Sequence, residues 1–306
     1  MAFSDRYRKP VQLLVRTIPY IEQESCFALK GGTAINLFIR DMPRLSVDID
    51  LTYLPVSDRD KSLLEIEEAL KRIANRIRHA DKTVHVTESA PSSQREINKL
   101  VVRTRDRVQI KVEVTPVLRG CVYEPLVMSV SPKVEDNFGY AQISVLSSAD
   151  LYAGKFVAAL DRQHPRDLFD VHYLLENDSI SNEFRKAFIV YLISHDHSPH
   201  SLLAPVLRDI TQDFEQNFVG MTREEINFEL LLSARERLIH DIAGNMPENH
   251  KVFLRSFYKR KPEWDLLGLE GAQDLPAVRW REINLDKAGR DTQSELVRKL
   301  DEVIGY

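Results

Sequence analysis

Two aspartates flank a single isoleucine in Asp48-Ile49-Asp50, shortly after a Gly-Gly-Thr turn at residues 31–33. On a β-strand, residues i and i+2 point to the same side, so both carboxylates should project together from an otherwise apolar strand. Adjacent anions repel each other unless a cation neutralises them, and carboxylate oxygens suit Mg²⁺. The alternative is an acidic pair on a solvated strand. Burying the apolar neighbours beside unpaired carboxylates would cost free energy that a bound ion removes.

The turn before this strand adds a second kind of group. Gly31 and Gly32 leave backbone N–H groups accessible, and Thr33 adds a hydroxyl at the start of a segment with helical character, residues 33–40. Such a turn is suited to holding a phosphate. The turn and the carboxylate pair together indicate metal-assisted chemistry on a nucleoside triphosphate.

The order of the expected elements predicts an α+β fold with two domains. Helices and strands alternate up to a boundary near residue 145, and the remainder is almost wholly helical. We therefore expect a mixed sheet with flanking helices in residues 1–145 and a helical domain in residues 146–306. The expected helices are 11–24, 33–40, 61–79, 148–160, 166–176, 181–193 and 225–242, and the expected strands are 46–53, 84–87, 100–103 and 108–114.

The helix at 61–79 is the most strongly patterned of these segments. Its apolar residues recur at helical spacing and predict one buried stripe. The residues assigned to this stripe are Leu63, Leu64, Ile66, Leu70, Ile73 and Ile77.

A third carboxylate would complete a two-metal site, and Glu113 is the best candidate. It lies in the strand 108–114, whose other face carries apolar residues. Two Mg²⁺ ions held by such a triad can activate the attacking group and offset charge on a leaving pyrophosphate. The alternative is that Glu113 pairs with Arg103 or Arg105 on a solvated face.

A second polar constellation lies in the helical half. Lys155 and Arg162 are seven residues apart on one helix, and Arg166, Asp167 and Asp170 open the next helix after Pro165. The basic side chains could hold phosphate oxygens while the aspartates orient them. A ladder of surface ion pairs is the alternative.

Two further segments leave alternatives open. Residues 195–200 read His-Asp-His-Ser-Pro-His, which fits no strong zinc spacing and is more typical of a solvated loop. The basic run at 255–261, interleaved with Phe257 and Tyr258, could contact RNA or could be a charged helix end.

Composition narrows the class of protein. The net charge of −4 provides no overall attraction for nucleic acid, so an RNA substrate would need a local basic patch. Cys26 and Cys121 are the two cysteines and lack metal-type spacing, which fits a reducing cytoplasm. No apolar run approaches the ~20 residues of a membrane span. We therefore expect a cytoplasmic protein without a membrane partner.

The chain resembles the AbiEii/AbiGii family of nucleotidyltransferase toxins, which includes the mycobacterial MenT proteins. Three separate stretches carry the resemblance. The first joins residues 31–34 to the Arg44-x-Ser46-x-Asp48-Ile49-Asp50 pattern, the second joins Lys155 and Arg162 to residues 166–170, and the third comprises Pro262-x-Trp264 and residues 275–280.

The resemblance implies a DNA polymerase β-like nucleotidyltransferase domain followed by a helical domain. It implies that Asp48 and Asp50 bind Mg²⁺ and that Gly31, Gly32, Thr33 and Ser46 lie at the triphosphate. Lys155, Arg162 and Arg166 would contact the nucleotide, and Asp167 or Asp170 would take the last catalytic position.

The activity implied is transfer of a nucleoside monophosphate from an NTP to an acceptor, a tRNA 3′ end. Toxins of this family belong to toxin–antitoxin or abortive-infection systems, so a cognate antitoxin is expected. The rival hypotheses are an antibiotic-type small-molecule nucleotidyltransferase, a protein nucleotidyltransferase, and a nucleotide-binding interaction protein without catalysis.

Overall fold

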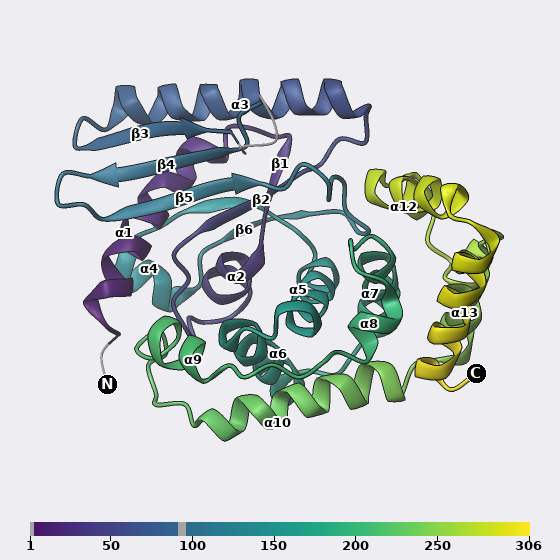
Figure 1. The fold of residues 1–306 in the computed structure, drawn as a ribbon. Coiled ribbons are helices and arrows are strands. Elements are labelled where there is room, and N and C mark those ends of the chain that lie inside the picture. The colour runs from purple at the N-terminus through teal and green to yellow at the C-terminus, as the bar shows by residue number, and fades with distance from the viewer. Residues whose placement is uncertain (1–2, 91–95) are drawn as a thin grey trace. The chain divides into compact units, whose positions relative to one another are not determined.

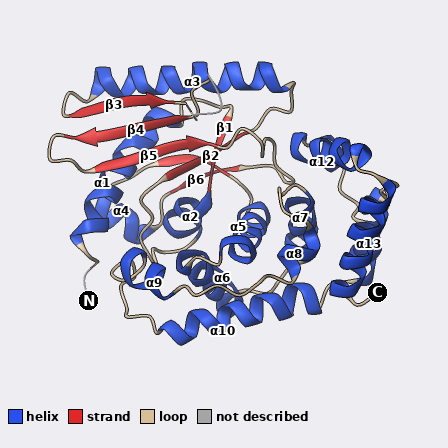
Figure 2. Ribbon diagram, viewed as in Figure 1, coloured by secondary structure: helices blue, strands red, loops and turns tan. Residues whose placement is uncertain are grey.

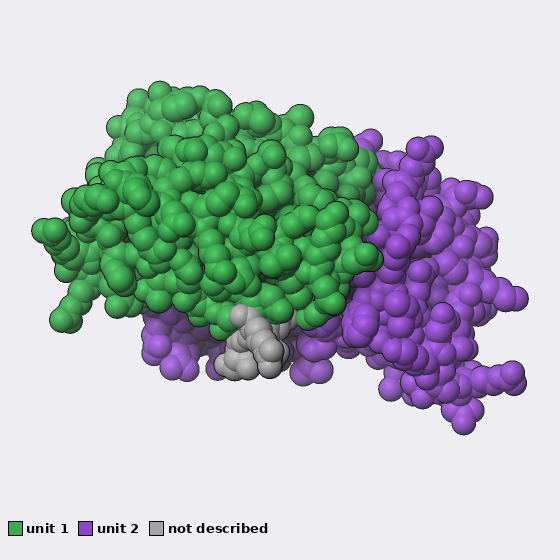
Figure 3. Space-filling model, turned by 90° about the horizontal axis from the view of Figure 1, so that it is seen from above, with its two compact units in different colours: residues 1–151, 219–225 green, residues 152–218, 226–306 purple. Residues whose placement is uncertain are grey.

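The computed structural model describes residues 3–90 and 96–306, and the chain divides into two compact units (Figure 3). Unit 1 comprises residues 1–151 and 219–225, and unit 2 comprises residues 152–218 and 226–306. Residues 219–225 thus belong to unit 1 although they lie within the helical half of the sequence. No helix in the described part of the chain is long and apolar enough to span a membrane.

Unit 1 contains a mixed sheet of seven strands in its described residues, in the order β3-β4-β5-β2-β1-β7-β6 (Figures 1 and 2). Two pairs, β2–β5 and β1–β7, are parallel, and the remaining neighbours are antiparallel. The strands are β1 (Phe27–Lys30), β2 (Ile49–Tyr53), β3 (Val84–Ser89), β4 (Lys99–Thr104), β5 (Gln109–Val114), β6 (Leu126–Ser129) and β7 (Gln142–Val145).

Helices cover this sheet and close the core of unit 1. The long helix α3 (Arg59–Ala80) packs beside β3 and β4, while α1 (Asp5–Ile21) contacts α3, β5 and β7 (Figure 1). The strand β5 alternates as predicted, with Ile110, Val112 and Val114 buried. The shorter helix α4 (Pro132–Phe138) begins at a proline in its first turn, where the missing N–H costs nothing.

The apolar stripe predicted for α3 is correct except at Leu64. Leu63, Ile66, Leu70, Ile73 and Ile77 are buried, whereas Leu64 is 56% exposed. The buried members recur at alternating spacings of three and four residues. Leu64 lies next to Leu63 and is therefore rotated about 100° away from the stripe.

The segment after β1 differs from a simple helix. It forms one α-helical turn, α2 (Gly31–Ala34), which continues into a π-helical stretch, η1 (Ile35–Ile39). A π-helical turn accommodates one extra residue per hydrogen-bonded ring, and such turns are frequent at functional sites. The predicted helix at 33–40 is therefore present, with an irregular interior.

Unit 2 is helical, and its first helix starts at the end of unit 1. The helix α5 (Ser148–Arg162) begins where Ser147 Oγ accepts a hydrogen bond from the Asp150 N–H at 3.0 Å. The other helices are α6 (Pro165–Asn177), α7 (Asn182–Ile193), α8 (Pro199–Leu203), α9 (Thr211–Asn217), α10 (Phe228–Ile239), η2 (His240–Gly244), α11 (Glu248–Tyr258), η3 (Trp264–Leu266), η4 (Ala272–Asp274), α12 (Pro276–Lys287) and α13 (Arg290–Ile304).

Aromatic rings fill much of the core of unit 2. Phe156 of α5 and Phe184 of α7 meet edge to face with centroids 4.7 Å apart, and Phe169 of α6 lies 5.6 Å from Phe218. Edge-to-face pairs of this kind add about 0.5–1.5 kcal/mol beyond the area they bury. These contacts pack α5 against α7 and α6 against Phe218, and both α5 and α6 carry the polar residues described below.

Candidate active site

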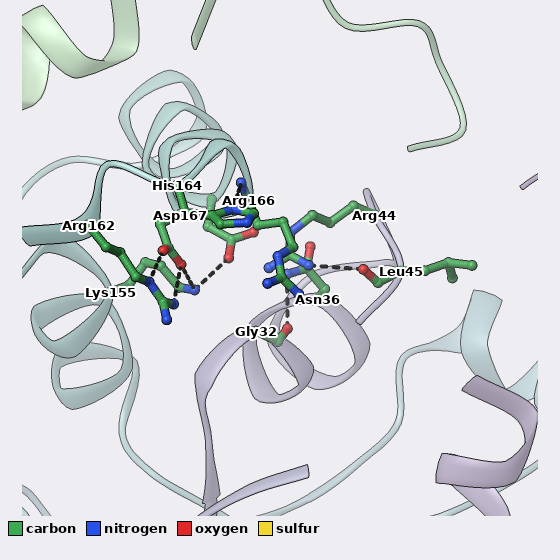
Figure 4. Close-up of polar contacts among 10 residues, drawn as sticks. Gly32, Asn36, Arg44, Leu45, Lys155, Arg162, His164, Arg166 and Asp167 are labelled. Atoms are coloured by element: carbon green, nitrogen blue, oxygen red, sulfur yellow. Dashed lines mark hydrogen bonds and ion pairs between the residues drawn. The ribbon is translucent and has the colours of Figure 1, made fainter. Parts of the chain in front are cut away.

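The Gly-Gly-Thr turn is bonded directly to the acidic strand of unit 1. Thr33 is buried, and its Oγ1 donates a hydrogen bond to the backbone carbonyl of Asp48 at 2.5 Å. Asn36 Nδ2 donates to the carbonyl of Gly32 at 2.9 Å, one turn into the helical segment (Figure 4). The hydroxyl predicted to serve a phosphate therefore also fixes the backbone of Asp48 relative to the turn.

Both glycines are required by close packing. Gly31 has φ +73°, and a Cβ atom there would lie 2.7 Å from Oδ2 of Asp50. At Gly32 a Cβ atom would lie 2.7 Å from Nη2 of Arg44 and 3.0 Å from Oγ of Ser46. No side chain fits at either position without displacing these groups, so the turn brings its backbone close to Asp50 and Ser46.

Arg44 is the buried cation of this turn. Its side chain is 2% exposed, and its Nη1 donates to the carbonyl of Leu45 at 2.9 Å (Figure 4). The connection around it is tied to residues 219–225, because the Leu45 N–H donates to the Met221 carbonyl at 2.8 Å. Arg44 thus belongs to a buried and hydrogen-bonded part of unit 1.

The strand register places Asp50 and Glu113 side by side. Asp50 in β2 is the direct partner of Glu113 in β5, and on its other side it is the partner of Lys30 in β1. Neighbouring strands lie about 4.8 Å apart, so two carboxylates in register come within reach of one cation. Asp48 lies two residues before Asp50, immediately ahead of β2.

Glu113 has a different cationic partner from those considered from the sequence. It forms an ion pair with Lys99 of β4, whereas Arg103 donates to Gln109 at 2.7 and 3.2 Å. The antiparallel register explains this, because Lys99 lies opposite Glu113 and Arg103 lies opposite Gln109. Both the Glu113 and Lys99 side chains are about one-third exposed, so this pair is accessible to solvent.

Lys30 completes a row of four charged residues across adjacent strands. The row runs Lys30, Asp50, Glu113 and Lys99 in β1, β2, β5 and β4. Lys30 Nζ donates to Thr115 Oγ1 at 2.8 Å. Burial lowers the pKa of Lys30 below its ordinary value, although the Asp50 carboxylate opposes this shift. Lys30 was not predicted as a site residue. Its position directly before the two glycines could have indicated it.

The oxygen donors of unit 1 fit a divalent cation of the magnesium type. Asp48, Asp50 and Glu113 are carboxylates, and hard cations such as Mg²⁺ prefer oxygen ligands. Lys30 and Lys99 occupy the two ends of the row, and the carboxylates of Asp50 and Glu113 occupy the two adjacent positions between them. The chemistry of these donors is therefore compatible with Mg²⁺ at Asp48 and Asp50, with Glu113 beside them.

In unit 2, Lys155 lies between two buried carboxylates. Its Nζ is 2.7 Å from Oδ1 of Asp167 and 3.0 Å from Oδ2 of Asp170. Arg162 Nε adds a contact to Oδ2 of Asp167 at 2.5 Å. Figure 4 shows the side chains of Lys155 and Arg162, both from α5, directed at Asp167 of α6. The predicted constellation is thus brought together, and both candidate aspartates contact the same lysine.

The two ion pairs of Lys155 are buried, which separates them from a ladder of surface pairs, whereas the Arg162 side chain is 56% exposed. The side chains of Asp167 and Asp170 are each 1% exposed, and that of Lys155 is 5% exposed. Burial alone would raise the pKa of Asp167, but Lys155 and Arg162 hold that pKa well below its usual range. Asp167 is therefore a carboxylate at all physiological pH values.

The start of α6 orients this group. His164 Nδ1 accepts a hydrogen bond from the backbone N–H of Arg166 at 3.1 Å and so caps the helix (Figure 4). Burial and the neighbouring Arg166 lower the pKa of His164 to about 4, so the ring is neutral and able to accept. His164 was not predicted, because histidine is an unusual N-cap residue.

The aromatic side chains of the basic run at 255–261 belong to the core of unit 2, so this segment does not present them to RNA. Phe257 and Tyr258 are 1% and 2% exposed, so neither ring is available to stack on a base. Arg255 forms an ion pair with Asp301 at 2.6 Å and lies 3.7 Å from the centroid of the Tyr306 ring. Of the two alternatives, the charged helix end describes this segment.

A Gly-Gly-Thr turn bonded to a carboxylate pair, set in a mixed sheet and followed by helices, is the arrangement expected of a nucleotidyltransferase. The sequence matches the family described as nucleotidyl transferase AbiEii toxin of type IV toxin–antitoxin systems over residues 12–279. The chain belongs to this AbiEii toxin family.

The fold also resembles a solved member of this class. The nucleotidyltransferase toxin MenT4 from Mycobacterium tuberculosis H37Rv superposes with a TM-score of 0.58 at 14% identity, covering 97% of this chain and 95% of that one. This likeness confirms the predicted α+β fold. The search of curated proteins found no match to the sequence.

Proposed function

We propose that this protein is a Mg²⁺-dependent nucleotidyltransferase that transfers NMP from an NTP to an acceptor hydroxyl, with the 3′ end of a tRNA as acceptor. The observation that carries the proposal is the Gly31–Thr33 turn, which packs against Asp50 and bonds to Asp48. The turn that we propose to bind phosphate is thus joined directly to the carboxylate pair. Membership of the AbiEii toxin family supports the same activity.

In the proposed reaction, the acceptor oxygen attacks the α-phosphorus of the NTP. A new P–O bond forms to the acceptor, the hydroxyl proton is lost, and the bond to the departing pyrophosphate breaks. Asp48 and Asp50 would hold Mg²⁺, which lowers the pKa of the attacking hydroxyl and offsets charge on the leaving group. Glu113 is the proposed third carboxylate, because it is the register partner of Asp50.

The turn would hold the triphosphate through its backbone N–H groups. Gly31 and Gly32 permit the close approach, the Thr33 hydroxyl fixes the turn, and Ser46 supplies a further hydroxyl beside Gly32. Donors that are already in place lose little entropy when charge develops in the transition state.

Lys155, Arg162 and Arg166 of unit 2 are proposed to act on the nucleotide phosphates. Lys155 is held by both Asp167 and Asp170, so these carboxylates would fix the direction of its side chain. We propose that Asp167 and Asp170 act through Lys155 as a pair. In this proposal Asp167 and Asp170 share the role that the family resemblance assigns to a single acidic residue.

The partners proposed for this activity follow from family membership. A type IV toxin–antitoxin system implies a cognate antitoxin and an NTP substrate. We propose that the protein works in the cytoplasm, where NTPs and tRNA are present.

The activity can be tested by label transfer. The protein is incubated with each α-labelled NTP, Mg²⁺ and total cell RNA, total protein or an aminoglycoside panel. We expect label on tRNA, and we expect Asp48→Asn to lower the rate at least about a thousandfold, or about 4 kcal/mol of transition-state stabilisation. Asp60→Asn is the matched control, because the Asp60 side chain is 97% exposed on α3.

The acceptor distinguishes the rival hypotheses. Label on a polypeptide or on an aminoglycoside would replace the tRNA assignment while keeping the nucleotidyltransferase mechanism. Absence of transfer with every NTP would leave the non-catalytic nucleotide-binding hypothesis, and equal transfer by Asp48→Asn would overturn the proposed site.

A further inference from the structure

Three metal-ligating side chains meet in unit 2 outside the residues discussed so far. Asp161 lies in the last turn of α5, and His195 and His197 lie in the connection between α7 and α8. One potential ligand atom of each lies within 4.8 Å of the other two. They are the one such group among the residues that the structure describes. The sequence did not predict this group, because Asp161 precedes His197 by 36 residues.

The distances place the carboxylate between the two rings. His197 Nδ1 is 2.8 Å from Oδ1 of Asp161, and His195 Nε2 is 3.8 Å from Oδ2 of Asp161. The two ring centroids are 5.4 Å apart with an interplanar angle of 59°. Zn²⁺ binds imidazole nitrogen and carboxylate oxygen at about 2.0–2.2 Å, so ligand atoms around one ion lie about 3–4 Å apart. Small side-chain rotations bring all three donors to that spacing.

The backbone around the cluster is already held in place. Arg281 of α12 donates to the carbonyl of Ile193 at 3.2 Å and to that of His197 at 2.9 Å. The His197 N–H donates to Nδ1 of His195 at 3.1 Å. That last bond leaves the proton of a neutral His195 ring on Nε2. Coordination at Nε2 would move this proton to Nδ1 and end the bond, at the cost of one hydrogen bond.

The donor set differs in chemistry from the carboxylates of unit 1. Two imidazoles and one carboxylate favour zinc and related first-row transition metals over Mg²⁺, which prefers oxygen. The His197 side chain is 61% exposed, while those of Asp161 and His195 are about one-quarter exposed. Solvent can therefore reach the cluster and supply a water as the fourth ligand.

We propose that Asp161, His195 and His197 form a transition-metal site that binds Zn²⁺ and joins the end of α5 to the α7–α8 connection. Asp161 directly precedes Arg162, which contacts Asp167. A metal ion would thus anchor the end of the helix that carries both Arg162 and Lys155. This site is independent of the proposed nucleotidyl transfer, and its test measures metal binding alone.

The test is a calorimetric titration of the chelator-stripped full chain with Zn²⁺ in excess Mg²⁺, which occupies oxygen-ligand sites. We expect one equivalent to bind, with affinity lowered at least tenfold in His197→Ala and in Asp161→Asn. The control is His240→Ala, because His240 pairs with Asp241 at 3.0 Å but belongs to no three-ligand group in the described chain. Equal affinity in wild type and His197→Ala would overturn the proposal, as would no binding.

A second measurement uses the wild-type chain, so it tests the proposal even if a variant fails to fold. Co²⁺ replaces Zn²⁺ in the wild-type chain, and its visible spectrum reports the ligands directly. Nitrogen and oxygen coordination without a thiolate charge-transfer band is expected. A thiolate band would assign the metal to Cys26 or Cys121 and overturn the proposal. Zn²⁺ should also raise the melting temperature of wild type and leave that of His197→Ala unchanged.

Discussion

Gly31 carries two separate constraints, and each can be measured. Its φ of +73° lies in the left-handed region that favours glycine, and its missing side chain leaves room for Oδ2 of Asp50. Gly271 has φ +75° and no atom within 4 Å of a Cβ built there. The two glycines therefore share the backbone constraint but not the contact.

We predict that Gly31→Ala lowers nucleotidyl transfer roughly a hundredfold by displacing the Asp50 carboxylate. Gly271→Ala should leave the transfer rate unchanged. Gly271→Ala should lose about 1–2 kcal/mol in the free energy of unfolding, because alanine is strained at positive φ, and Gly31→Ala should lose at least as much because its Cβ also meets Asp50. The rates come from the label-transfer assay and the stabilities from urea denaturation. Equal rates in the two variants would contradict a role for the close contact.

Lys155 provides the second prediction at the scale of single residues. Lys155→Met should lower the free energy of unfolding by about 3–5 kcal/mol, because it leaves the buried carboxylates of Asp167 and Asp170 without their shared cation. Lys71→Met is the control, since the Lys71 side chain is 49% exposed and pairs with Glu67 on the same helix, and its stability should be nearly unchanged. Chemical denaturation measures both. A small loss in Lys155→Met would mean that the group is solvated.

At the scale of elements, the hydrogen bond that caps the start of α6 should make the stability of the protein depend on pH. A neutral His164 ring accepts the Arg166 N–H, and burial and Arg166 lower the pKa of His164 to about 4. In the unfolded chain a histidine has a pKa of about 6.5, so the unfolded state binds more protons between these values. The stabilising contribution is therefore complete above about pH 6.5 and is lost as the pH falls towards 4.

We predict that His164→Asn flattens this part of the pH dependence while keeping the cap, because an asparagine side chain also accepts at the N-cap. The difference between the two proteins should be on the order of 1–2 kcal/mol after discounting for solvent screening. Burial also lowers the pKa of His250 to about 4. Both proteins contain His250, so its contribution cancels in the difference between them. Denaturation curves at pH 4.5 and 7 measure the effect. Parallel pH profiles would refute it.

At the scale of the whole molecule, residues 219–225 are a part of unit 1 supplied from the helical half of the sequence. The Ser4 N–H donates to the Gly220 carbonyl at 3.3 Å, and Arg44 and Thr222 form an isolated β-bridge. Met221 is 1% exposed. Unit 1 therefore lacks part of its core when it is expressed as residues 1–151.

We predict that a fragment of residues 1–151 gains stability when residues 219–225 are joined to its N-terminus by a flexible linker. The melting temperature should rise by roughly 5 °C or more, because burying a methionine of this kind contributes about 2–5 kcal/mol. The same fusion with Met221→Ser should lose the gain. Equal melting temperatures for all three fragments would contradict the assignment of this segment to unit 1.

Local patterns predicted the elements whose periodicity is strong. The α3 helix, the β3, β4 and β5 strands, and the first three helices of the second half all lie close to their expected positions. The short strands β1, β6 and β7 were not predicted, because four residues carry too little periodicity to be recognised. The π-helical stretch was missed for a related reason, since its pattern is that of an ordinary helix.

The sequence alone determined the family and the α+β class, and it predicted the metal-binding character of the Asp48-Ile49-Asp50 segment, because these depend on residue types at short spacings. Only the tertiary structure showed that Lys30, Asp50, Glu113 and Lys99 form one row, since strand register pairs Asp50 with Glu113, 63 positions later in the chain. It likewise brought Asp161 to two histidines of a distant loop. Such contacts depend on how strands pair and helices pack, and no local pattern encodes that.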